Sequence, residues 1–340
     1  MKDQVKKLWR LCFNDSEEFT ELYFRLRYTD DINAAIWSGD ELIAALQMIP
    51  YPLTFCGQTV RTAYISGACT HPDFRNRGVM GELLAESFAR MHRNRVSFAT
   101  LIPAEPWLFG YYARTGFAPV FGLCRQTFVP TSCPALPPDT CVETADGFSE
   151  EASTYLYRKQ QERPCCVLHT ADDLKVVEAD LQLSGGKVFA LKADGRTAAL
   201  AVAYPEAGER WTVGEVVADS PQAQADLLDS LCHTVQASEL TLLLPPSEGD
   251  GSEVRPLGMA RIVDVRDVLH LYAAAHPEAE LNLEVTDNQL AANNGYYYLN
   301  NGKCMESDRR LPGRHLSLSI GELTQLLLEP ARPYMSLMLN

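Results

Sequence analysis

The sequence predicts an α/β (α+β) protein in which mixed sheets are flanked by helices. A β-prone apolar run over residues 63–69 leads through a short loop into an apolar pattern of helical period over 79–91. A second series of strands and helices fills residues 148–244, and a smaller series follows from residue 259. Because 340 residues are too many for one hydrophobic core, we expect two or three domains.

The first segment, to about residue 130, opens with a helix and an antiparallel pair of strands. An N-cap and acidic first turn at residues 14–18 predict a helix that runs to about Tyr28. Strands are expected over 32–37 and 42–55, the second of which should be interrupted by its two prolines. A further strand then ends at the loop that begins at residue 70.

That loop carries a pattern typical of phosphate binding. Residues 70–82 read Thr-His-Pro-Asp-Phe-Arg-Asn-Arg-Gly-Val-Met-Gly-Glu. Free N–H groups in the first turn of a helix and the positive end of its dipole both point at a bound anion. Gly78 removes a Cβ where the backbone approaches a ligand, and Gly81 keeps the first turn narrow. The alternative is an ordinary strand–loop–helix joint with two solvated arginines.

A second motif follows in a fixed order. After a predicted strand over 96–102 and a short helix from Pro106, residues 112–117 read Tyr-Ala-Arg-Thr-Gly-Phe. This order of elements and motifs resembles the GNAT family of acetyl-CoA-dependent N-acetyltransferases. The family's loop reads Gln/Arg-x-x-Gly-x-Gly/Ala, and Met80 departs from it at the last position. A bulky aliphatic residue there is similar to the Eis (enhanced intracellular survival) branch.

The resemblance implies tandem GNAT folds followed by a small α+β domain that resembles sterol carriers. The expected divisions are a catalytic domain over 1–130, a degenerate GNAT-like domain over 131–258 and the sterol-carrier-like domain over 259–340. In the middle domain, residues 218–221 (Ala-Asp-Ser-Pro) take the place of the arginine–glycine loop. Asp219 and Glu215 would repel a pyrophosphate there, so we expect this domain to be non-catalytic.

Acetyl-CoA is the cosubstrate that the resemblance implies. Backbone amides of the loop would hold the pyrophosphate. The pantetheine arm would lie along the strand before it, where an N–H can also stabilise the oxyanion. The expected acetyl-CoA-binding residues are Ala68, Cys69, Thr70, Arg75, Asn76, Arg77, Gly78, Val79, Met80 and Gly81. An acyl-enzyme on Cys69 is the alternative, but no His lies beside it in the sequence, and Cys is frequent in buried strands.

Two catalytic residues follow from the same resemblance. Tyr112 matches the tyrosine that protonates the leaving thiolate, and its alternative role is aromatic packing. The carboxylate of Asn340 matches the C-terminal base of Eis-type enzymes. The tail over 333–339 is apolar and should be buried, which favours this assignment. The alternative is a final strand whose carboxylate reaches solvent.

The acceptor is expected to be a small-molecule or peptide amine, and a net charge of −14 favours a cationic one while arguing against nucleic acid. We expect direct transfer to a primary amine. By position in the family or by charge, four residues could line the acceptor site, namely Ser66, Asp30, Asp31 and Glu105.

The remaining composition predicts a cytoplasmic enzyme without a metal. No apolar run is long enough to span a membrane, and the first residues do not form a signal peptide. The ten cysteines are scattered, with no Cys-x-x-Cys or His-Glu-x-x-His pattern. The resemblance implies a homo-oligomer, with a hexamer as the family's form. The rival functions are an acyltransferase for longer acyl groups and a lipid or peptide carrier with a vestigial transferase domain.

Overall fold

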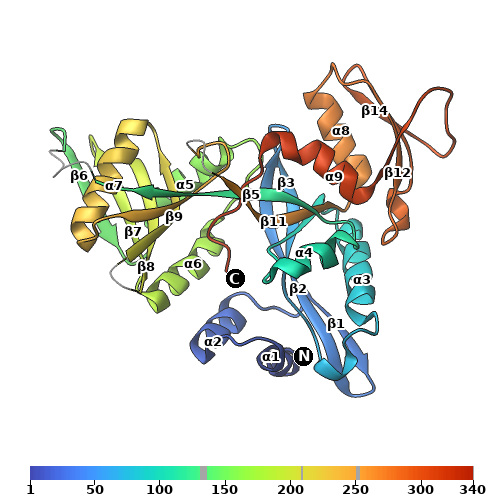
Figure 1. Ribbon diagram of the computed structural model, residues 1–340, viewed down its shortest axis with the longest axis horizontal. Coiled ribbons are helices and arrows are strands. Elements are labelled where there is room, and N and C mark those ends of the chain that lie inside the picture. Colours follow the sequence, from blue (N-terminus) through green and yellow to red (C-terminus); the bar gives the residue numbers. More distant parts are fainter. Residues whose placement is uncertain (131–135, 208–209, 250–252, 340) are drawn as a thin grey trace. The chain divides into compact units, whose positions relative to one another are not determined.

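The computed structural model describes residues 1–130, 136–207, 210–249 and 253–339, and its elements are labelled in Figure 1. The chain divides into two compact units. Unit 1 consists of Met1–Phe121 and Leu257–Ala331, and unit 2 consists of Gly122–Pro256 and Arg332–Asn340. Both predicted motifs therefore lie in unit 1.

The first sheet of unit 1 is mixed. Its strands are β1 (Asn33–Ser38), β2 (Glu41–Phe55), β3 (Gln58–Thr70), β4 (Phe98–Leu101) and β11 (Val254–Ile262). Strands β1, β2 and β3 are antiparallel neighbours, β3 and β4 are parallel, and β4 pairs with the end of β11 in the antiparallel sense. The helices beside this sheet are α1 (Lys2–Cys12), α2 (Glu17–Leu26), α3 (Val79–Arg93) and α4 (Pro106–Ala113), and a short 3-10 turn covers Pro72–Phe74.

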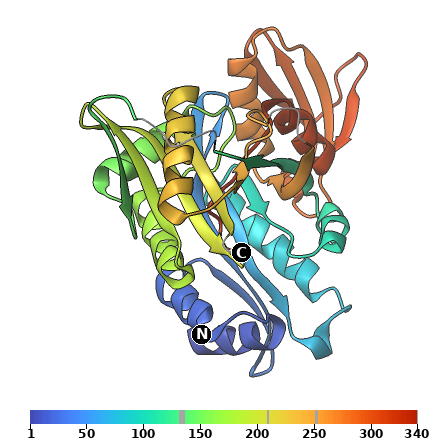
Figure 2. The ribbon, with the colours of Figure 1, turned by 60° about the vertical axis from the view of Figure 1, so that its left-hand side comes forward.

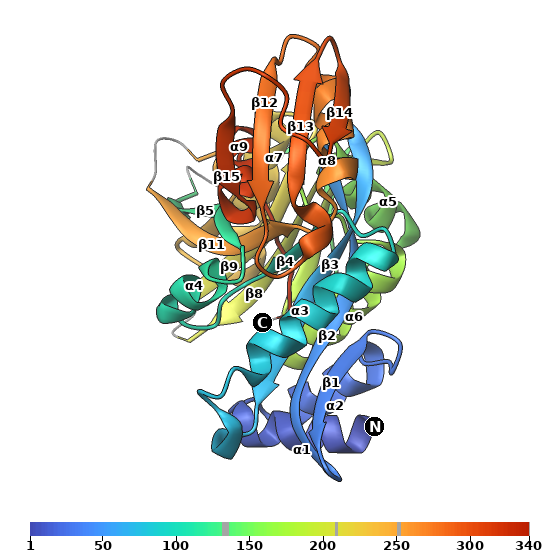
Figure 3. The same cartoon turned by 90° about the vertical axis from the view of Figure 1, so that its right-hand side faces the viewer.

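Two groups of helices pack on opposite faces of this sheet. Leu46 and Ile65 belong to the hydrophobic cluster that α3 completes. The next residues along, Gln47 and Ser66, both bond the Tyr23 hydroxyl of α2. Because successive residues of a strand point to opposite faces, α2 and α3 cover different sides. Figure 3 shows α3 running along β2 and β3.

Strand β2 corrects one expectation, because its two prolines do not interrupt it. Pro50 pairs with Ala63 and Pro52 with Arg61 of β3. The pairing of β2 with β1 ends at Gln47, so both prolines lie beyond that ladder. A missing N–H is tolerated where one edge of a strand is unpaired, which is why the strand continues.

Unit 1 also contains a four-stranded sheet in the order β14-β13-β12-β15. Strands β12 and β15 are parallel, and the other neighbours are antiparallel. Figure 3 shows these strands side by side with α8 and α9 near them. The elements are α8 (Val265–Ala275), β12 (Leu281–Thr286), β13 (Gly295–Asn300), β14 (Lys303–Ser307), β15 (Leu316–Ser319) and α9 (Ile320–Leu328), with 3-10 turns at Ala291–Asn293 and Glu329–Ala331.

Unit 2 repeats the mixed-sheet plan (Figure 2). Its strands follow the order β5-β10-β9-β8-β7-β6, in which β9 and β10 are parallel. One hydrophobic cluster packs α7 on the sheet, and another packs α5 and α6. The elements are β5 (Ala118–Phe128), β6 (Thr140–Ala145), α5 (Glu150–Gln161), α6 (Ala171–Ser184), β7 (Lys187–Ala193), β8 (Arg196–Glu206), β9 (Arg210–Ala218), α7 (Pro221–Val235) and β10 (Leu240–Leu244).

The mixed strands of each unit with their flanking helices, and the four-stranded sheet of unit 1, confirm the predicted fold class. Several elements were not expected from the sequence, among them α1, α6, β5, β6 and β14. No helix in the described part of the chain has the length and apolarity that a bilayer crossing requires.

Candidate active site

A β-bulge shapes the end of β3. Ser66 pairs with Gln47 and Cys69 pairs with Ala45, so two residues of β3 oppose the single Leu46 of β2. The first of them, Gly67, has a φ of +58°. A Cβ on Gly67 would lie 2.1 Å from Cζ3 of Trp9, so both its backbone angle and its neighbour require glycine.

The bulge also changes which way the following side chains point. Ala68 packs against the hydrophobic cluster that contains α3. Cys69 instead pairs with Ala45 on the other face of the sheet, and Cys12 at the end of α1 contacts the carbonyl oxygen of the next residue, Thr70. The side chains of Ala68 and Cys69 therefore point to opposite faces of the sheet. The main chain between them is the part that the pantetheine arm is expected to contact.

Strands β3 and β4 separate just before these residues. Their parallel pairing covers Thr62, Ala63 and Tyr64 of β3, and Ala68, Cys69 and Thr70 lie beyond it. Thr100, the partner of Tyr64, is fully buried, and its hydroxyl lacks a hydrogen-bond partner among the described residues. Main-chain groups past a separation of this kind can accept an added extended ligand, as in strand addition.

The loop after β3 presents the features that anion binding needs. Gly78 is the N-cap of α3 with a φ of +82°, and no side chain caps the helix. The N–H groups of the first turn accordingly have no acceptor within the helix. A Cβ on Gly78 or on Gly81 would meet no atom within 4 Å, so both face open space. Arg75, Asn76 and Arg77 are exposed around this end of the helix.

The apolar residues of the loop have a packing role. Val79 and Met80 are half-buried against the cluster that holds α3 to the sheet. Met80, which departs from the general family pattern, thus anchors the first turn of the helix. Arg75 donates from Nε to the carbonyl oxygen of Thr70 at 3.2 Å, and the Arg77 guanidinium lies 5.3 Å from the Phe74 ring.

Tyr112 lies near the C-terminal end of α4 and is nearly buried, with 8% of its surface exposed. Its ring packs edge-on against Tyr111 and Phe117. Burial raises the pKa of Tyr112 to about 12, and Tyr111 and Cys69 add to the shift. Tyr112 belongs to the same hydrophobic cluster as Ala63 and Ile65 of β3. A tyrosine with this pKa keeps its proton at neutral pH and can donate it.

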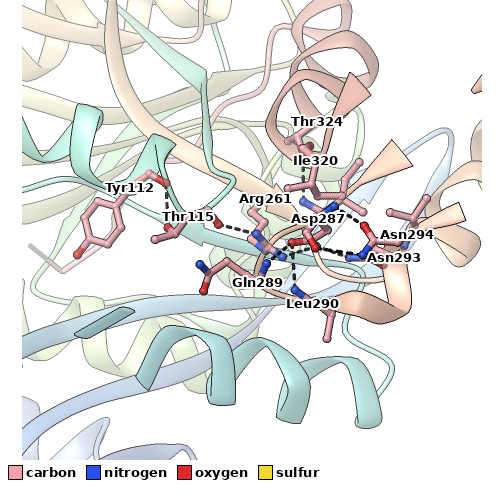
Figure 4. A network of polar contacts seen from close by, with 12 residues as sticks. Tyr112, Thr115, Arg261, Asp287, Gln289, Leu290, Asn293, Asn294, Ile320 and Thr324 are labelled. Carbon is pink, nitrogen blue, oxygen red and sulfur yellow. Dashed lines mark hydrogen bonds and ion pairs between the residues drawn. The ribbon is translucent and has the colours of Figure 1, made fainter. Parts of the chain in front are cut away.

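A buried ion pair fixes the turn that follows Tyr112 (Figure 4). Arg261 of β11, with no exposed surface, donates to the Thr115 carbonyl at 2.5 Å and to Asp287 Oδ2 at 2.5 Å. Its guanidinium also lies 4.1 Å from the Phe88 ring of α3. A Cβ on Gly116 would come within 2.3 Å of Arg261 Nη1. The glycine of the Tyr-x-x-x-Gly-Phe motif is therefore required by the arginine beneath it.

Asp287 is satisfied by several further donors. Its carboxylate accepts from Asn293 Nδ2 at 2.9 Å and from the backbone N–H groups of Gln289 and Leu290 at 2.9 and 3.1 Å. Burial lowers the pKa of Arg261, while Asp287 acts in the opposite direction. Nothing in the sequence singles out Arg261 or pairs it with Asp287, which lies 26 residues further along the chain.

The four expected acceptor-site residues lie in different surroundings. Ser66 is buried and accepts a hydrogen bond from Tyr23 at 2.9 Å. Asp30 is exposed and accepts from the Tyr28 hydroxyl at 2.8 Å, and the backbone carbonyl of Asp31 accepts from Arg90 of α3. Glu105 is exposed at the N-terminus of α4. Of these, Ser66 alone lies on the strand that leads to the loop.

Asn340 lies outside the described residues, but the tail before it is held firmly in unit 2. Tyr334 is buried, donates its N–H to the Cys165 carbonyl at 3.0 Å and its hydroxyl to the Leu243 carbonyl at 3.1 Å. Ser336 donates to Glu215 Oε2 at 2.5 Å. The expectation that the apolar tail is buried is met up to these residues.

Glu215 has a different role from the one expected. It is fully buried, and both of its oxygens accept hydrogen bonds from Arg163, at 2.9 and 3.0 Å. The charge that was expected to repel a pyrophosphate is thus neutralised inside unit 2 and helps to hold the tail.

No group of three or more His, Cys, Asp or Glu side chains suited to a metal ion gathers within the described ranges.

Comparisons with known proteins agree with this architecture. Residues 2–120 match an acetyltransferase (GNAT) domain model, and residues 265–335 match a sterol carrier protein domain model. No curated protein sequence matches the chain.

Solved structures match nearly the whole chain at low identity. A GCN5-related N-acetyltransferase from Anabaena variabilis superposes with a TM-score of 0.77 at 18% identity, over 98% of this chain and 96% of that one. A probable N-acyltransferase from Enterococcus faecalis gives 0.76 at 16% identity, over 96% and 87%. Eis1 from Mycobacterium abscessus gives 0.75 at 15% identity, over 96% and 87%.

The first domain match identifies residues 2–120 as a GNAT acetyltransferase domain, and the solved structures share the fold of nearly the whole chain. The protein combines a GNAT acetyltransferase domain with a C-terminal sterol carrier protein domain, as the sequence motifs predicted.

Proposed function

We propose that the protein transfers the acetyl group of acetyl-CoA directly to a primary amine of a small molecule or peptide. The observation that carries this proposal is the joint between β3 and α3, where a ligand-accepting strand end meets a helix N-terminus that no side chain caps. Exposed Arg75 and Arg77 add positive charge beside it. An elongated thioester with a pyrophosphate group fits this combination of main-chain and anion-binding features.

Direct transfer is favoured over an acyl-enzyme on Cys69. Hydrogen bonding to Cys12, together with burial, raises the pKa of Cys69 well above its usual value. Its thiol therefore stays protonated and is a poor nucleophile at neutral pH. Attack by the amine on the thioester carbon breaks the carbon–sulfur bond, and Tyr112 donates a proton to the leaving CoA thiolate.

The base in this proposal is the C-terminal carboxylate of Asn340. A free α-carboxyl group titrates at roughly 3.3–3.7, so it is ionised at pH 7 and can accept the ammonium proton directly or through a water. This assignment rests on the resemblance to Eis-type enzymes, while the bonds of Tyr334 and Ser336 fix the tail only within unit 2. We further propose a cationic acceptor, a cytoplasmic location and a homo-oligomer that could be a hexamer.

Acetyl-CoA binding tests the first part. A ligand at 100 times its dissociation constant should stabilise the protein by about 2.7 kcal/mol in thermal unfolding. A panel of amines with mass detection then identifies the acceptor. If acetyl-CoA neither binds nor is consumed, the protein is instead a lipid or peptide carrier with a vestigial transferase domain.

Extension of the C-terminus tests the base. Residues added after Asn340 displace the carboxylate, so kcat should fall by about 10²–10⁴-fold while acetyl-CoA still binds. Asn340→Ala keeps a terminal carboxylate and should be far milder. If the extended protein retains full kcat, the base is not the terminus and must be sought among Asp30, Asp31 and Glu105.

A further inference from the structure

Two cysteines from distant parts of the sequence meet beside the acetyl-CoA strand. Cys12 is the last residue of α1, and Cys69 is the penultimate residue of β3. Both are free thiols. Cys12 Sγ lies 3.4 Å from the carbonyl oxygen of Thr70, the residue that follows Cys69, and interaction between the two thiols shifts the pKa of each.

The bulge in β3 explains why they meet. Trp9 packs over Gly67, and Cys12 follows Trp9 by one turn of α1, so both project from the same side of the helix. The extra residue of the bulge puts Cys69 opposite Ala45 and turns it toward that side, where Cys12 contacts the adjoining Thr70 carbonyl. The pairing is therefore built into the backbone.

The two thiols are unequal in exposure and charge. Cys12 is half-exposed, whereas only 4% of the Cys69 surface is accessible. The Arg75 guanidinium bonds the same Thr70 carbonyl that Cys12 contacts. Interaction with the Cys69 thiol, and secondly with Arg75, lowers the pKa of Cys12 to about 6. The positive charges of Arg75 and His71 act in the same direction.

We propose that Cys12 and Cys69 form an oxidation site in which a hydroperoxide converts the dithiol to a disulfide. The Cys12 thiolate attacks the terminal peroxide oxygen, the O–O bond breaks, and with hydrogen peroxide one water leaves as Cys12 becomes a sulfenic acid. The Cys69 sulfur then attacks the Cys12 sulfur as its thiol proton passes to the departing hydroxide, so the S–O bond breaks and the second water leaves. Two thiols and one peroxide thus give one disulfide and two waters.

This site does not depend on the proposed acetyl transfer, since it rests on the two sulfur atoms and their neighbours. A disulfide here joins α1 covalently to the strand expected to hold the pantetheine arm. Oxidation of the pair therefore changes that strand whether or not the enzyme is turning over.

The test treats the whole protein with hydrogen peroxide at pH 6, blocks remaining thiols and maps cross-linked peptides by mass spectrometry. The exposed Cys141 of unit 2 serves as the internal reference. At pH 6, a thiol of pKa about 6 is half ionised. Its ionised fraction is about 150-fold that of an ordinary thiol, and its lower nucleophilicity reduces the rate advantage to about 10-fold. Cys12 should therefore react about 10-fold faster than an ordinary exposed thiol, ahead of Cys141, and appear linked to Cys69.

Variants sharpen this result. Cys69→Ser should leave a Cys12 sulfenic acid that dimedone traps, and Cys12→Ser should abolish the cross-link. Cys141→Ser is the matched control and should leave the cross-link unchanged, and dithiothreitol should reverse it. If Cys69→Ser does not fold, mapping of the unaltered protein decides. Oxidation of Cys12 no faster than Cys141, or to a sulfinic acid without a cross-link, would overturn the proposal.

Discussion

The two units contain the same kind of joint with opposite properties. In unit 1, β3 leads through a loop into α3, and in unit 2, β9 leads through a loop into α7. Each strand also pairs in parallel with the strand that follows the helix, β4 in one case and β10 in the other. The two joints therefore share the same order and pairing of strand, loop, helix and strand, and the difference that matters for ligand binding lies in the loop residues.

The loops differ in which helix N–H groups they leave available. Gly78 caps α3 without a side chain, so the first-turn N–H groups remain available to a ligand. At α7, Ser220 accepts from Ala223 N at 3.1 Å, and Pro221 has no N–H to offer. Asp219 adds a carboxylate that bonds Arg158 at 3.2 Å. An anion site thus arises from groups that a loop leaves unsatisfied, and the strand–helix joint alone does not create one.

Gly78→Glu should have the largest effect on this comparison. It places a carboxylate against the expected pyrophosphate, and two unit charges about 4 Å apart near a protein surface repel by about 4 kcal/mol. Acetyl-CoA affinity, measured by calorimetry, should fall by at least about 100-fold. Gly195→Glu is the matched control, because Gly195 of unit 2 also has positive φ and open space around its Cβ position. Equal losses in both variants would mean that the effect is general destabilisation.

Tyr112→Phe should act on turnover and leave binding intact. It keeps the ring that packs on Phe117 but removes the proton, so kcat should fall by about 10²–10⁴-fold with a similar acetyl-CoA affinity. Tyr111→Phe, on the same helix, is the control and should be near normal. Because the pKa of Tyr112 is about 12, its proton is present throughout pH 6–9, and it should add no falling limb to the activity profile there. A Phe variant with full kcat would make Tyr112 a packing residue.

Asp287→Asn should destabilise unit 1 strongly. It leaves the buried Arg261 charge uncompensated, and breaking a buried pair by removing one partner costs about 3–5 kcal/mol. Urea unfolding followed by a probe in each unit should show unit 1 unfolding earlier. Glu215→Gln breaks the corresponding buried pair with Arg163 and should affect unit 2 instead. Simultaneous loss of both units in each variant would show that they unfold as one.

Ser220→Ala should have the smallest effect. It tests whether loss of the α7 cap creates an acetyl-CoA site in unit 2. Loss of an N-cap costs about 1 kcal/mol, so unit 2 should unfold slightly earlier. Calorimetry should still give one acetyl-CoA per chain with unchanged affinity, since α7 is not expected to bind the cosubstrate. A changed affinity or a second bound acetyl-CoA would contradict the distinction between the two joints.

Local sequence signals predicted some of the elements that carry their own cap or motif, but not all of them. The Arg-x-x-Gly loop predicted α3, as observed, and Ser220 with Pro221 is a comparable start signal at α7. The helix α6 also has a readable signal, because Thr170 and Asp173 form a capping box. By contrast, α1 has no side-chain cap, although its buried residues Val5, Leu8 and Trp9 follow a helical spacing.

The parts of the site that escaped prediction depend on contacts between distant residues. The reason for glycine at position 116 is Arg261, which the sequence places in another segment. The pairing of Cys12 with Cys69 depends on a bulge that a strand pattern does not reveal. Side-chain direction at a bulge and the partner of a buried charge are set by tertiary packing, so periodicity could not supply them.

The order of segments in unit 1 has a consequence for how the chain is made. Strand β4 ends at Leu101, but its neighbour β11 ends only at Ile262. Between them in the sequence lies all of unit 2 except its last nine residues. At typical rates of protein synthesis, this delay is on the order of ten seconds, during which the nascent chain exposes one edge of β4. Exposed strand edges recruit other strands, so chains released early by the ribosome should aggregate unless a chaperone covers that edge. By the end of this interval unit 2 lacks only its final tail. It can therefore form most of its sheet before β11 is available to pair with β4 in unit 1.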